Sequence, residues 1–236
     1  PTVSSFTTTT ASGSYKQNDT VEITANTNKA IQNGNTITVT LSDSCGTVTL
    51  TALSAGTTLV GTYIVEAGHT SAGLTVSSFA IGTVADTAGN AMTSTTFPDA
   101  SSIFGSKTIV IDTTAPAFSE ISLTTNTSVN TTAVGYTLSE AIASGRVTWT
   151  RTGGSDDANS PHTTHLTGSE LNSGPFGPAA LTNPPTLVDG TIYTVTFNST
   201  DAAGNAAIAL DVTGITYDTT APAFSEISLT TNTSVN

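Results

Sequence analysis

The segment LVDGTIYTVTFNSTDAAGN, residues 187–205, contains the pattern that decides the fold. An Asp-Gly pair precedes a run from 191 to 197 in which Ile, Tyr, Val and Phe are interspersed with Thr, and Asp-Ala-Ala-Gly-Asn closes the segment. Alternation with a period of two is typical of a β-strand that buries one face. Asp, Asn and Gly are typical turn residues. The segment therefore predicts a β-strand between two turns.

Similar short runs of Thr, Val, Ile and Tyr occur along the whole chain, and none of it shows convincing helical periodicity. Further examples lie at 21–24, 36–41, 59–65, 134–138 and 147–151. About seven short strands in roughly 100 residues suit a Greek-key sandwich of immunoglobulin type. We therefore predict an all-β fold, with Trp149 and Tyr193 as core or half-core residues of the second module.

The chain also repeats itself. DTTAPAFSEISLTTNTSVN at 112–130 recurs unchanged at 218–236, a period of 106 residues. A shorter echo relates ADTAGNA, which ends at Ala91, to TDAAGNA, which ends at Ala206. Repeats of this kind are typical of tandem arrays. We predict an immunoglobulin-like module at 1–111, a second at 112–217, and the first strand of a further repeat at 218–236.

The composition excludes several classes of partner. Only 9% of the residues are charged, with 5 Lys and Arg against 17 Asp and Glu, whereas Thr and Ser number 52 and 27. Five basic residues cannot build a surface for a phosphate backbone, so we expect no nucleic acid partner. No apolar run approaches the roughly 20 residues of a membrane span, so we expect no direct insertion into a membrane. The single Cys45 cannot form an internal disulfide.

Residues 187–205, followed by DTTAP at 218–222, resemble the immunoglobulin-like and fibronectin-like tandem repeats of large bacterial surface adhesins. The resemblance covers 112–217 well. It is looser over 1–111, which keeps DTAGN at 86–90 but differs in its strands and loop lengths. It implies an extended stalk of sandwich domains outside the cell, at the cell surface, often stiffened by Ca²⁺ at the domain junctions.

The strand directions expected in the second module predict where its acidic side chains lie. If the first strand, near 118–125, runs away from the incoming linker, the strand at 134–138 returns and brings Glu140 to the pole where the chain enters. The strand at 193–200 runs in the same direction as this second strand, because the last strand must lead away to the next linker. Asp201 therefore falls at the same pole.

Four oxygen-bearing side chains then converge at the junction of the two modules: Asp112 of the linker, Glu140, Asp201 and Asn205. Carboxylate and amide oxygens are the ligands that Ca²⁺ takes in proteins. Three carboxylates this close repel one another without a cation. We predict a structural calcium site here, with ordinary turn chemistry as the alternative, since Asp and Asn before Gly are common in turns.

Two further positions repeat parts of this pattern. Asp86 and Asn90 occupy the equivalent loop of the first module, where the preceding strand offers no carboxylate, so we predict a weaker site there. Asp218 begins the second DTTAP and belongs to the next junction.

The range 153–185 is rich in Gly, Pro, Ser and Asn, and carries Asp156, Asp157, His162 and His165. Histidines beside carboxylates are possible ligands of a transition metal, but this spacing is weak evidence on a loop. An exposed excursion between strands, available to neighbours or ligands, is the simpler interpretation.

No nucleophile elbow, phosphate-binding loop, CxxC or HExxH motif occurs, so we expect no enzymatic activity. We predict a structural spacer, stalk or filament segment of an extracellular adhesin-like repeat protein, whose partners are the neighbouring repeats of the same chain. One alternative is a filament subunit in which 218–236 is exchanged between copies. The other is a module that binds a host or matrix glycan or protein through loop 153–185.

Overall fold

The computed structural model describes residues 1–99, 101 and 103–224. The chain forms two compact units. The first contains Pro1–Pro116 together with Thr200–Ala207, and the second contains Ala117–Ser199 together with the residues from Ile208 onward. The first unit thus extends to Pro116, beyond the expected end at residue 111. Most of the strand expected at 218–236 lies outside the described residues.

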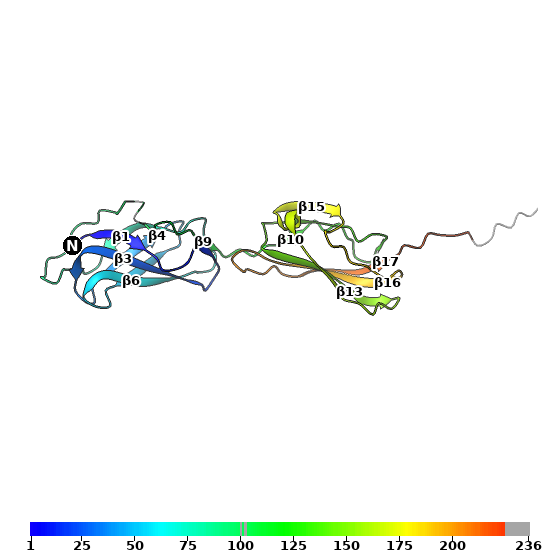
Figure 1. Cartoon of the computed structure of the whole chain (residues 1–236), viewed down its shortest axis with the longest axis horizontal. Coiled ribbons are helices and arrows are strands. Elements are labelled where there is room, and N and C mark those ends of the chain that lie inside the picture. The colour runs from blue at the N-terminus through cyan, green and yellow to red at the C-terminus, as the bar shows by residue number, and fades with distance from the viewer. Residues whose placement is uncertain (100, 102, 225–236) are drawn as a thin grey trace, which may run out of the picture. The chain divides into compact units, whose positions relative to one another are not determined.

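The first unit is built mainly from a six-stranded sheet with the order β1-β3-β6-β5-β4-β8 (Figure 1). Its strands are β1 (Val3–Thr7), β3 (Thr20–Ile31), β4 (Thr36–Leu41), β5 (Thr47–Thr51), β6 (Gly56–Ile64) and β8 (Val76–Ile81). A smaller sheet contains β2 (Gly13–Tyr15), β7 (Thr70–Ser71) and β9 (Ile109–Asp112).

The large sheet folds over on itself to form two layers. Its strands β5 and β6 pair only at Thr51 and Val60 within the described residues. The two edge strands then face each other across the interior, because the rings of Phe6 on β1 and Phe79 on β8 have centroids 5.8 Å apart. The first unit is therefore a sandwich.

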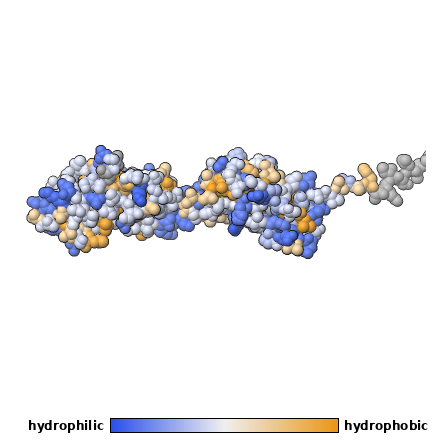
Figure 2. Space-filling model, in the orientation of Figure 1, coloured by the Kyte–Doolittle hydropathy of each residue, from blue (hydrophilic) through white to orange (hydrophobic). Residues whose placement is uncertain are grey.

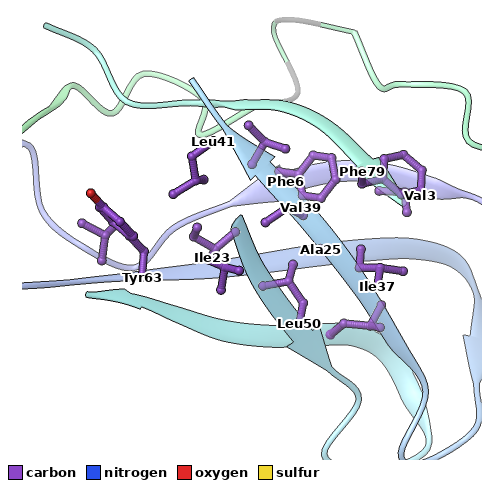
Figure 3. Packing of buried hydrophobic residues seen from close by; sticks show 14 of the residues in the cluster. Val3, Phe6, Ile23, Ala25, Ile37, Val39, Leu41, Leu50, Tyr63 and Phe79 are labelled. Atoms are coloured by element: carbon purple, nitrogen blue, oxygen red, sulfur yellow. The ribbon is translucent and has the colours of Figure 1, made fainter. Parts of the chain in front are cut away.

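Alternation along each strand fills this sandwich. On β4, Ile37 and Val39 are fully buried, whereas Thr36 and Thr38 are half-buried and Thr40 is exposed. Figure 3 shows Phe6 and Phe79 side by side, with Tyr63 at one end of the labelled group. Cys45, which precedes β5, is also buried in this core.

The second unit has two sheets, with the orders β10-β12-β15 and β11-β17-β16-β13-β14. Their strands are β10 (Phe118–Ser119), β11 (Ser128–Val129), β12 (Val134–Leu138), β13 (Ser144–Gly154), β14 (His162–His165), β15 (Gly174–Ala179), β16 (Thr191–Thr200) and β17 (Leu210–Tyr217). Trp149 and Tyr193 are fully buried, and their rings meet edge to face at 6.0 Å. Both were predicted to be core or half-core residues, and the structure places them in the core.

The predicted all-β fold with sandwich modules in tandem is confirmed. Two of the relations expected in the second unit are also observed, since β10 is antiparallel to β12 and β16 to β17. A 3₁₀ turn, η2 (Gly168–Leu171), interrupts the strands. No helix in the described part of the chain is long and apolar enough to cross a membrane. The visible face of each unit is mostly hydrophilic or neutral (Figure 2).

Candidate metal centre

The loop that follows β16 is closed by its own side chains. The backbone N–H of Asn205 donates to Oδ1 of Asp201 at 2.8 Å, and the Asn205 side-chain Nδ2 donates to Oδ2 at 2.7 Å. The backbone N–H of Asp201 in turn donates to the carbonyl of Asn205 at 3.1 Å. Gly204 has a φ of 88°, a conformation that glycine adopts without steric cost. The loop thus holds the Asp201 carboxylate, which is 3% exposed, in a fixed position.

Asp112, the last residue of β9, lies beside this loop in the same unit. Its carbonyl accepts a hydrogen bond from Nδ2 of Asn205 at 2.9 Å. Carboxylate oxygens of Asp112 and Asp201 lie within 4.8 Å of each other. The structure therefore brings together two of the predicted ligands, which are 89 positions apart in the sequence.

The electrostatics of this pair favour a cation. Among the described residues, neither Asp112 nor Asp201 forms an ion pair with a Lys or Arg side chain. The nearby ammonium of Lys16 donates instead to the carbonyl of Gly204 at 2.9 Å. Two carboxylates at this separation repel one another. Oxygen donors of this kind suit a hard cation such as Ca²⁺.

Asn205 differs from its expected role. We expected its amide oxygen to be a ligand, whereas the structure turns its amide nitrogen toward Asp201 and the carbonyl of Asp112. In this arrangement Asn205 acts as a brace that joins the loop to the end of β9.

Glu140 belongs to the second unit and follows the end of β12. The preceding residue, Ser139, exchanges two hydrogen bonds with Ala117: its N–H donates to the Ala117 carbonyl at 3.1 Å, and its Oγ accepts from the Ala117 N–H at 2.9 Å. Glu140 therefore lies at the pole of the second unit where the chain enters, as expected from the strand directions. Its role as a ligand stays a prediction.

The loop at Asp86 and Asn90 repeats the closure of the 201–205 loop. Asn90 donates to Oδ1 of Asp86 through its backbone at 2.8 Å, and to Oδ2 through its side chain at 2.9 Å. The side-chain and backbone hydrogen bonds from Asn90 are the main causes that hold the pKa of Asp86 below its ordinary value. The weaker metal site expected at Asp86 and Asn90 stays a prediction.

Asp218 follows β17 in the second unit. Its backbone N–H donates to the carbonyl of Val129 at 2.9 Å, and its Oδ1 accepts from the N–H of Thr220 at 3.0 Å. Its expected part in a further junction stays a prediction.

The range 153–185 is not a single loop, since it contains β14, η2 and β15. Asp157 is buried and accepts hydrogen bonds from Tyr193 at 2.7 Å and from His162 at 2.6 Å. Burial raises the pKa of Asp157, but these two bonds and others outweigh it, so the net pKa lies below the ordinary value.

The other two side chains considered there have separate surroundings. Asp156 pairs with Arg151 at 3.5 Å, and His165 lies opposite Arg146 across the β13–β14 ladder. Of the residues considered for a transition metal, Asp156, Asp157 and His162 thus take part in structural contacts, and metal binding stays a hypothesis. Glycan or protein binding by this range stays a prediction.

Glu170 is a buried carboxylate that the sequence analysis missed. Its Oε2 accepts from the N–H of Thr167, and its Oε1 from the N–H of Thr182, each at 2.6 Å. These bonds fasten η2 to the chain that follows β15. The Thr-x-x-Glu spacing of Thr167 and Glu170 is a capping-box signature and could have indicated the first bond.

Comparison with known proteins adds a likeness of fold. No protein-family pattern and no curated protein matches the chain. The fibronectin(III)-like modules of CbhA from Clostridium thermocellum are similar in structure, with 9% identity, a TM-score of 0.33, and coverage of 90% of this chain and 94% of that one. The FN1–FN3 domains of chicken CNTN1 share 12% identity at a TM-score of 0.32, with 91% of this chain and 66% of that one covered. Because both scores are low, the assignment of sandwich modules relies on the sheets described above.

Proposed function

We propose that this chain is a spacer segment of an extracellular, cell-surface repeat protein of the adhesin type. Two sandwich units in one chain and the unchanged recurrence of a 19-residue segment support this role. So do the low content of charged residues and the Thr-rich outer faces of strands such as β4, which keep a β surface wettable. The proposed role is mechanical and non-enzymatic.

We further propose that Ca²⁺ binds at Asp112 and Asp201 and stiffens the junction. The observation that carries this proposal is the approach of the two carboxylates to within 4.8 Å with no Lys or Arg ion pair among the described residues. Glu140 is the proposed third carboxylate, because it lies at the pole where the chain enters the second unit. Backbone carbonyls and water complete the six to eight ligands that Ca²⁺ takes.

A Ca²⁺ titration of the full chain tests the proposal. Thermal unfolding and small-angle scattering are followed together, with EDTA as the reference condition. A cation that binds only the folded protein stabilises it by about 2.7 kcal/mol at a free concentration of 100 times Kd. We expect a higher melting temperature and a longer, stiffer particle. If neither the melting temperature nor the scattering profile changes with Ca²⁺ or EDTA, the calcium site is contradicted.

Two matched variants separate cation binding from closure of the loop. Asp201→Asn and Asp86→Asn remove one carboxylate each from loops with the same internal hydrogen bonds. We expect Asp201→Asn to abolish the response to Ca²⁺ and Asp86→Asn to retain it. Equal loss in both variants contradicts the assignment of the site to Asp201.

Strand exchange between copies is a second candidate, in which Phe224 would take in a neighbouring copy the place that Phe118 has in its own unit. Phe118, at the same place in the repeated segment, is 7% exposed and packs against Tyr136 and Phe197, whereas Phe224 is 93% exposed. Sedimentation of the full chain over a range of concentrations tests it. Exchange predicts association that Phe224→Ala abolishes, and a monomer at all concentrations contradicts it.

A further inference from the structure

The two DTTAP segments begin with the same local structure. Oδ1 of Asp112 accepts from the N–H of Thr114 at 3.0 Å, and Oδ1 of Asp218 accepts from the N–H of Thr220 at 3.0 Å. The identical sequence thus forms the same short turn in each unit.

What holds each segment to its own unit differs. In the first unit, the hydroxyl of Thr113 donates to the carbonyl of His69 at 3.0 Å and accepts from the N–H of Gly68 at 3.1 Å. The Thr113 hydroxyl thus makes both of these contacts with backbone groups of one turn, while the carbonyl of Asp112 accepts from Nδ2 of Asn205 at 2.9 Å.

In the second unit, one carboxylate replaces these backbone groups. Oδ1 of Asp189 accepts from the N–H of Thr219 at 2.5 Å and from its hydroxyl at 2.7 Å. Oδ2 accepts from the hydroxyl of Thr220 at 2.9 Å. Hydrogen bonds to a charged acceptor are shorter and stronger than those between neutral groups.

The turn that carries Asp189 is itself fixed. The N–H of Thr191 donates to the carbonyl of Val188 at 3.2 Å, and Gly190 has a φ of 74°. The N–H of Gly190 donates to the carbonyl of Tyr217 at 2.7 Å, which ties the turn to the end of β17. Asp189 is therefore held beside the point where the chain leaves the last strand.

We propose that Asp189 is a clamp that fixes the direction in which the chain leaves β17, without the help of a bound cation. Its value to a spacer depends on the function proposed above, but the clamp itself does not. The lowered pKa of Asp189, caused first by the Thr219 N–H and then by the two hydroxyls, agrees with a carboxylate stabilised in its charged form.

Amide hydrogen exchange in the full chain, measured by NMR in Ca²⁺ and again in EDTA, tests the clamp. In Asp189→Ala we expect exchange at Thr219 to accelerate about tenfold, the effect of losing one net hydrogen bond of ordinary strength. Thr114 in the same sample is the internal reference and should not change. Asp189→Asn keeps one oxygen acceptor, so its effect should be smaller.

Asp211→Ala is the matched control. It removes an exposed carboxylate of the same unit, which accepts a hydrogen bond from the hydroxyl of Thr196 at 2.6 Å. This substitution should leave the rate of amide exchange at Thr219 unchanged. An unchanged rate of exchange at Thr219 in Asp189→Ala overturns the clamp. So does a Thr219 amide that is protected in the unmodified protein in Ca²⁺ and loses this protection in EDTA. Failure of the calcium proposal is distinguishable from failure of the clamp. In that case the melting temperature does not change with Ca²⁺, while Asp189→Ala still accelerates exchange at Thr219.

Discussion

The loops at 86–90 and 201–205 share a sequence pattern and an internal structure, yet they have different surroundings. In each, the backbone and side chain of an Asn donate to the carboxylate of an Asp four residues earlier. The first loop has Lys29 as an attractive charge on Asp86. The second has the carboxylate of Asp112 within 4.8 Å of Asp201.

This difference separates what the motif does from what its neighbours add. Asp-x-x-Gly-Asn closes a tight loop at both places in this chain, because the Asn donates to the Asp and the Gly takes a positive φ. The second carboxylate beside Asp201 comes from Asp112 at the end of β9, and the proposed calcium site depends on it. The motif alone identifies a turn.

The largest expected effect is the loss of either loop carboxylate. Asp201→Ala leaves the N–H and the side chain of Asn205 without their acceptor, and we expect a loss of about 1–3 kcal/mol in the free energy of unfolding. Asp86→Ala should destabilise the first unit for the same reason. Differential scanning calorimetry in EDTA compares the two without the effect of a cation. If only one variant is destabilised, the loops are not equivalent.

The second largest effect should be the opening of the loop at 86–90 in acid. The pKa of Asp86 lies below its ordinary value of 3.8, chiefly because Asn90 donates to the ionised carboxylate. A group whose pKa is lowered by folding contributes stability above its unfolded pKa and loses it as the pH falls through the folded value.

Carboxyl ¹³C NMR should therefore show more than half of the Asp86 carboxyl groups ionised at pH 3.8, with the loop opening at lower pH. In Asn90→Ala the transition should move to higher pH. An unchanged midpoint in that variant contradicts the assigned cause.

The smallest effect should follow from removal of Lys29. Its electrostatic attraction is the weakest of the causes that lower the pKa of Asp86, and its side chain is exposed to solvent that screens it. Lys29→Met should raise the pKa of Asp86 by less than Asn90→Ala does, in the same NMR titration. A larger shift than that of Asn90→Ala shows that the lysine, and not loop closure, dominates.

The sequence predicted best the strands in which alternation is flanked by clear turns. The bounds expected at 36–41 and 134–138 coincide with β4 and β12. The strand expected at 118–125 is only β10, Phe118–Ser119. Glu120 has a φ of 49°, which no regular strand accommodates, and nothing in its residue type announces that conformation.

The sequence could predict the candidate site only to the extent that strand directions determine which residues lie close together. Tracing strands placed Asp201 near Asp112, because strand order fixes which ends share a pole. The orientation of the Asn205 amide depends on hydrogen bonds to groups that are distant in sequence, so its role could not be predicted. For the same reason, the sequence did not predict the hydrogen bond from Lys16 to the Gly204 carbonyl or that from the Thr219 N–H to Asp189.

The burial of Cys45 makes it a chemical reporter for one unit alone. The chain contains 1 cysteine, whose side chain is 1% exposed in the first unit, and burial is the main cause that raises the pKa of its thiol. Alkylating reagents attack the thiolate, so they modify Cys45 only after the surrounding structure opens. The rate of alkylation therefore measures the opening of the first unit, while the single Trp149 reports fluorescence from the second. The natural sequence thus provides an independent probe for each half of the chain, with no label added.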